Sequence, residues 1–90
     1  MRELVHQRYL RLVDSSGTLF DTVRVFAEPT EDGTWRGIVE FVTADGRILE
    51  TEPETTQSNV EGVAYWATGL EPVYFEGALE RALRAAGAAL

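Results

Sequence analysis

The hydrophobic pattern of this 90-residue chain changes its period once, and this change restricts the fold more than any other feature of the sequence. From about residue 9 to residue 51, apolar and polar side chains alternate, which is typical of half-buried β-strands. From residue 60 onward, apolar side chains recur at spacings of three and four, which is typical of amphipathic helices. The sequence therefore predicts strands followed by helices, the order of an α+β protein.

Turn residues divide the first part of the chain into strands. The segment 14–17 reads Asp-Ser-Ser-Gly, the segment 29–33 begins with Pro and ends in Asp-Gly, and Asp45-Gly46 favours a two-residue hairpin turn. Predicted strands then occupy residues 9–13, 19–27, 35–42 and 47–51. Because short turns join neighbouring strands, we expect an antiparallel β-meander of three to four strands.

Two helices are predicted after the strands. For the first helix, at residues 60–67, Ser58 and Glu61 match a capping box, and Gly69 is expected to end the helix in the left-handed conformation. Residues 63–66 also fit a strand. The second helix is expected to begin at Pro72. Its apolar stripe is Phe75, Leu79, Ala82, Leu83 and Ala86. We expect both helices to pack on one face of the sheet, in a single domain of residues 1–90.

The composition excludes several kinds of functional site. There is no cysteine, so disulfides, thiolate metal sites and cysteine nucleophiles are excluded, and the lone His6 excludes a His-rich zinc site within one chain. The sequence contains no G-x-S-x-G elbow, no phosphate-binding glycine loop with Lys and no H-E-x-x-H motif. We therefore expect no cofactor and no metal, and a protein without enzymatic activity rather than an enzyme.

Charge and hydropathy set expectations about compartment and partners. Fifteen acidic residues against eight arginines give a formal net charge of −7, which disfavours duplex DNA and anionic membranes as partners. No apolar run approaches the roughly 18–20 residues of a transmembrane helix, and the N-terminal residues lack the apolar core of a signal peptide. We expect a cytoplasmic protein that does not bind membranes.

The sheet face that the helices leave open is the first candidate site. Strand alternation gives this face the apolar residues Phe20, Phe26, Ile38 and Val42 and the arginines Arg11, Arg24 and Arg36. Exposed sheet faces are seldom so apolar, and arginine and aromatic residues are enriched in interface cores. We therefore expect a small interaction domain that homodimerises or binds a protein partner through this face. Stacking of single-stranded RNA bases on the same face is an alternative that the acidic net charge disfavours.

The segment 51–59 is the second candidate site. It contains no large apolar residue and is longer than a usual connection of about 4–6 residues, so we expect a polar loop. Its hydrogen-bonding side chains are Thr55, Thr56, Gln57 and Asn59. The alternative function is therefore binding of a small molecule or a divalent cation at this loop, or hydrolysis there.

Two segments of the chain carry a resemblance to a known family. They are residues 26–35, which include Phe-Ala-Glu and Glu-Asp-Gly-Thr-Trp, and the terminal helix with Glu-Gly-Ala-Leu-Glu-Arg-Ala at residues 76–82. Together they resemble HicB-type antitoxins, which are acidic strand–helix domains that pair with small basic toxins. The resemblance implies a basic protein as partner. The Pro-and-Gly loop of that family is missing, and the helix predicted at residues 60–67 is an addition, so an antitoxin-like role is kept as a further alternative.

Overall fold

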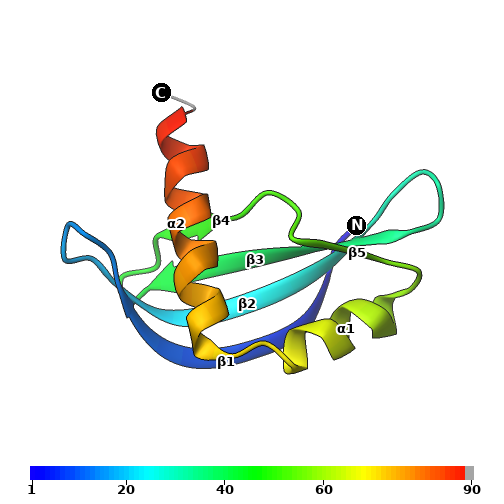
Figure 1. The fold of residues 1–90 in the computed structure, drawn as a ribbon, viewed down its shortest axis with the longest axis horizontal. Coiled ribbons are helices and arrows are strands. Elements are labelled where there is room, and N and C mark those ends of the chain that lie inside the picture. Colours follow the sequence, from blue (N-terminus) through cyan, green and yellow to red (C-terminus); the bar gives the residue numbers. More distant parts are fainter. Residues whose placement is uncertain (89–90) are drawn as a thin grey trace.

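The computed structural model describes residues 1–88, which form an antiparallel sheet followed by two helices (Figure 1). The strands are β1 (Glu3–Val13), β2 (Leu19–Pro29), β3 (Trp35–Thr43), β4 (Ile48–Glu50) and β5 (Thr55–Gln57), and the helices are α1 (Val60–Thr68) and α2 (Pro72–Ala88). The strand order is β1-β2-β3-β4, and β5 also pairs with β3. The predicted α+β class, with a meander and two C-terminal helices packed on one face, is confirmed.

The three hairpins of the meander use one type of turn. In the β3–β4 turn, Gly46 donates its backbone N–H to the Thr43 carbonyl at 3.0 Å, and Thr43 donates to the Arg47 carbonyl at 2.9 Å. Gly46 has a φ of +91°, a conformation that residues with a Cβ avoid. The turns that contain Gly17 and Gly33 repeat both hydrogen bonds and the positive φ. Each loop therefore has three residues and ends in a glycine bulge, where Asp45-Gly46 had predicted a two-residue turn.

The segment 51–59, predicted as a loop, is held along β3. Thr51 donates its backbone N–H to the Val39 carbonyl at 2.9 Å, and its hydroxyl accepts from the Val39 N–H at 3.1 Å. Glu54 then donates to the Gly37 carbonyl at 2.8 Å, and β5 pairs with Trp35, Arg36 and Gly37. Strands β4 and β5 thus share one edge of β3, because β2 occupies the other edge.

Residues 60–68 are helical, which decides between the helix and the strand that the sequence allowed. Asn59 is the N-cap, and its side-chain oxygen accepts the N–H of Gly62 at 2.7 Å, so the capping box predicted at Ser58 is wrong by one residue. Gly69 ends the helix as predicted, but with φ −86° and ψ −4°, so the expected left-handed conformation is wrong. Helix α2 begins at Pro72, as the sequence predicts.

This cap can be tested by substitution. We expect Asn59→Ala to lower the free energy of unfolding by about 1 kcal/mol, because the Gly62 N–H loses its acceptor. Ser58→Ala, one residue earlier on an exposed side chain, should change it by less than about 0.5 kcal/mol. Urea unfolding followed by circular dichroism measures both. A larger effect for Ser58 than for Asn59 would contradict the assigned cap.

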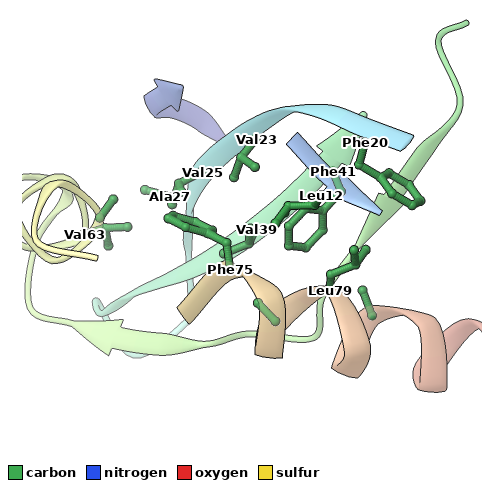
Figure 2. Packing of buried hydrophobic residues seen from close by; sticks show 13 residues of the cluster. Leu12, Phe20, Val23, Val25, Ala27, Val39, Phe41, Val63, Phe75 and Leu79 are labelled. Carbon is green, nitrogen blue, oxygen red and sulfur yellow. The ribbon is translucent and has the colours of Figure 1, made fainter. Parts of the chain in front are cut away.

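The hydrophobic core lies between the sheet and the two helices (Figure 2). Its fully buried large side chains are Phe41, Phe75, Val23, Val25, Val39 and Val63. They come from β2, β3 and both helices, and α2 crosses the sheet with its C-terminal end extending past β4 (Figure 1). The inward residues of β2 and β3 alternate with outward ones, so this packing also fixes which side chains the opposite face carries.

Phe20 lies in this core, whereas the sequence placed it on the open face. It is 6% exposed and packs edge to face against Phe41, with ring centroids 6.4 Å apart (Figure 2). The reason is a register shift between Phe20 and Thr22 in the pairing of β2 with β3. One extra residue reverses the alternation, so Phe20 points to the same side as Val23.

Candidate interaction surface

The sheet face opposite the helices, called the open face below, is built from bands of side chains that run across the strands. Its residues are Leu4, Gln7, Tyr9, Thr22, Arg24, Phe26, Glu28, Arg36, Ile38, Glu40, Val42, Ile48, Glu50 and Thr56. One band, from β1 to β4, contains Tyr9, Thr22, Val42 and Ile48. The next band, called the charged band below, contains Gln7, Arg24, Glu40 and Glu50. Beyond it lie Leu4, Phe26 and Ile38.

Ion pairs neutralise the arginines of this face. Arg24 binds Glu40 on the neighbouring strand at 3.0 Å and donates to the Gln7 side chain at 3.2 Å. Arg36 binds Glu28 at 3.3 Å. Arg24 on β2 and Arg36 on β3 therefore each lie opposite a glutamate of the neighbouring strand and not opposite each other.

Arg11, the third arginine of the predicted set, lies apart from the other two. A register shift between Tyr9 and Leu12 interrupts the pairing of β1 with β2 at this point. Arg11 lines a hollow of about 480 Å³ between the end of β1 and α2, where Glu76 and Glu80 also lie. It therefore belongs to the end of the sheet and not to the charged band of the open face.

Arg2 covers part of the open face, which the sequence did not predict. Its guanidinium lies over the Phe26 ring, 5.1 Å from the centroid, and binds Glu28 at 2.9 Å and Glu50 at 3.0 Å. Hydrogen bonds to Glu50 and Glu28 raise the pKa of Arg2, and the hydrogen bond from Arg2 lowers the pKa of Glu28. Under this guanidinium Phe26 is half-buried, and its cross-strand neighbour Ile38 is only 5% exposed within one chain.

Apolar side chains at the margins of the open face remain in water. Leu4 and Tyr9 on β1 are 52% and 76% exposed, and Ile48 on β4 is 58% exposed. Val42 is half-buried between Thr22 and Ile48. The exposed apolar surface therefore lies at the margins, with Tyr9 and Ile48 at the two ends of one band and Leu4 at the β1 end of the other.

The predicted loop residues lie on both sides of β5 and at the start of α1. Thr55 and Gln57 lie on the helix side of β5, where the Thr55 methyl group approaches Gly37 and the Gln57 side chain donates to the Thr55 hydroxyl at 2.8 Å. Thr56 pairs with Arg36 and is exposed on the open face. Asn59 uses its side chain to cap α1. Thr56 is thus separated from the other three, and the Thr55 hydroxyl and the Asn59 side chain already accept hydrogen bonds within the chain.

Glu54, from the same segment, joins the sheet to α2. Its carboxylate accepts hydrogen bonds from the Tyr74 hydroxyl and from Arg81, whose Nη2 lies 2.6 Å away. Burial raises the pKa of Tyr74 to about 12, with the Glu54 contact acting in the same direction. Burial opposes ionisation of Glu54, but the hydrogen bonds from Arg81 and Tyr74 outweigh it and lower its pKa. Because all three groups satisfy one another, the cluster stabilises the fold.

Further properties of residues 1–88 bear on the kind of site. They contain no group of three or more His, Asp or Glu side chains placed to hold a metal ion. None of the helices in this part of the chain has the length and apolar character needed to cross a membrane. Comparison with protein families, with curated proteins and with solved structures found no match for the chain.

Proposed function

We propose that this protein is a small interaction domain that binds another protein molecule through the open face, either a second copy or a different partner. The observation that supports this best is the exposure of Tyr9 and Ile48 on one band of a sheet face. Burial of an apolar side chain of this size is worth about 1.5–3 kcal/mol, so a partner that covers both margins gains a large stabilisation. Exposed apolar side chains that share one face of a protein are typical of interaction sites.

The charges of the open face favour protein over RNA. Binding of single-stranded nucleic acid requires arginines that neutralise phosphates. On this face, Arg2, Arg24 and Arg36 already bind glutamates. A phosphate backbone would have to displace these carboxylates, whereas a protein surface with polar and apolar groups would not.

The proposal predicts that one substitution at the margin of the face weakens binding. We expect Ile48→Arg to weaken association at least about tenfold, because a charge replaces an apolar contact at the interface. Val73→Arg is the matched control, since Val73 is 68% exposed on α2 and lies outside the open face. Because both wild-type side chains are exposed, both variants should keep the wild-type far-UV circular dichroism.

Association is measured in two ways. Light scattering over a range of concentrations reports self-association, and quantitative mass spectrometry compares the proteins retained by immobilised wild type and by each variant. Loss of either association in Ile48→Arg, with retention in Val73→Arg, supports the proposal. Equal behaviour of the two variants, or a wild type that neither self-associates nor retains any protein, contradicts it.

A further inference from the structure

The central strands of the open face carry complementary cross-strand pairs. From one end to the other, the β2–β3 pairs are Thr22 with Val42, Arg24 with Glu40, Phe26 with Ile38, and Glu28 with Arg36. Each charged residue therefore has an opposite charge as its neighbour, and Phe26 has another apolar residue. This pattern makes the face complementary to a rotated copy of itself.

The rotation that uses this complementarity is a two-fold axis between β2 and β3, parallel to both strands. It reverses the order of the strands, so each β2 residue faces the second copy's equivalent of its own neighbour on β3. Arg24 then faces Glu40 of the second copy. Phe26 takes the position opposite Ile38 of the second copy, with the Arg2 guanidinium over its ring. Sheets packed face to face usually align their strands within about 30°. At this angle the central residues of β2 still lie opposite the paired β3 residues of the second copy.

The outer strands continue the same pattern. The band of Tyr9, Thr22, Val42 and Ile48 crosses all four strands from β1 to β4. When the strand order is reversed, Tyr9 faces Ile48 of the second copy, and Ile48 faces Tyr9 of the second copy. The most exposed apolar groups at the two margins therefore meet each other, as an isologous interface requires.

Charge also favours a second copy as the occupant. The ion pairs of the open face involve three arginines and three glutamates, so the excess of acidic residues behind the net charge of −7 lies outside these pairs. The ion-paired charges on each open face sum to zero, so two copies that meet at these faces do not repel each other there. A basic partner would instead be drawn to the other surfaces, which carry the acidic excess.

The face is also large enough for a dimer. Four strands spaced about 4.8 Å apart and nine residues that rise about 3.4 Å each give a projected area of roughly 600 Å². Protruding side chains make the accessible area larger than this projection. Stable interfaces bury about 600–1,000 Å² on each partner, so the face reaches the lower part of this range when nearly all of it is covered.

We propose, on the basis of the function proposed above, that the open face binds a second copy of this chain, packed face to face about this two-fold axis. The axis makes a specific prediction, because it places Tyr9 of one copy against Ile48 of the other. Tyr9→Arg and Ile48→Asp should each weaken homodimerisation at least about tenfold. Both variants should remain folded, because both wild-type side chains are exposed in the single chain. An equimolar mixture should associate more tightly than either variant alone, because one Arg–Asp contact and one wild-type contact form in the heterodimer.

Native mass spectrometry distinguishes the heterodimer from both homodimers, and sedimentation equilibrium gives the dissociation constants. The control mixture pairs Tyr9→Arg with Val73→Asp, which carries the same new charge on α2 outside the open face. Tighter association of Tyr9→Arg with Ile48→Asp than with the control supports the proposal. Equal association of the two mixtures overturns the two-fold arrangement, and a wild type that stays monomeric at millimolar concentration overturns the second copy as occupant. Neither result decides the function proposed above, because the retention of other proteins by wild type and Ile48→Arg tests it separately.

Discussion

Replacement of Phe75 by alanine is expected to lower the free energy of unfolding by about 3–5 kcal/mol, the range for removal of a buried aromatic side chain. Phe75 is 0% exposed and lies between α2 and the sheet (Figure 2). Its ring packs edge to face against Tyr74 at 5.9 Å, and the Arg8 guanidinium lies 4.7 Å from its centroid. The substitution would leave a cavity and also remove the ring that Arg8 contacts. Because small domains are stable by only about 5–15 kcal/mol, a large part of the stability would be lost.

Guanidinium unfolding followed by circular dichroism measures this loss. Tyr65→Ala removes another aromatic ring from a helix, but Tyr65 is 84% exposed, so its effect should stay within about 0.5 kcal/mol. A loss below about 1 kcal/mol for Phe75→Ala would mean that α2 does not pack through this side chain.

Gly37→Val is expected to destabilise the protein by about 3 kcal/mol, the upper part of the range for overpacking. A Cβ atom at Gly37 would lie 2.7 Å from the Thr55 methyl group, 3.1 Å from Val63 and 3.3 Å from Trp66. Valine adds two further methyl groups beyond that Cβ. These neighbours belong to β5 and α1, so both elements would have to move away from β3.

Thermal unfolding and amide hydrogen exchange test this second prediction together. Exchange should accelerate at Thr55 and Gln57, because β5 loses its place beside Gly37. Gly87→Ala is the control, since no atom lies within 4 Å of the added Cβ and alanine favours the helix by up to about 1 kcal/mol. Unchanged stability of Gly37→Val would show that α1 and β5 do not approach β3 as closely as described.

The sequence predicted the meander and the two helices because their signals are local. Alternation over several residues and a helical stripe after Pro72 each need only neighbouring positions. Phe20 was misplaced because a single register shift reverses the face of every residue beyond it, and alternation alone does not reveal the shift. Strand β5 was missed because a three-residue polar strand at an edge shows no hydrophobic period.

The candidate surface was predictable in its residue types but not in its contacts. Alternation placed Arg24, Phe26 and Ile38 on the open face, as the pairing of β2 with β3 has them. The cover over Phe26 depends on Arg2, whose acidic partners lie 26 and 48 residues further along the chain. No local pattern links residues so far apart, so the coverage of Phe26 by Arg2 required the folded structure.

The three short turns of the meander also bear on how quickly the chain folds. Each strand from β2 to β4 pairs with the strand immediately before it, across a loop of three residues that ends in a glycine bulge. Closing so short a loop takes well under a microsecond, and hairpins form in roughly 1–10 microseconds. The contacts between α2 and the sheet, such as Phe75 against the core, join residues far apart in sequence. Packing of the two helices on the sheet therefore closes much longer loops than the hairpins do, and it carries the larger loop-closure entropy.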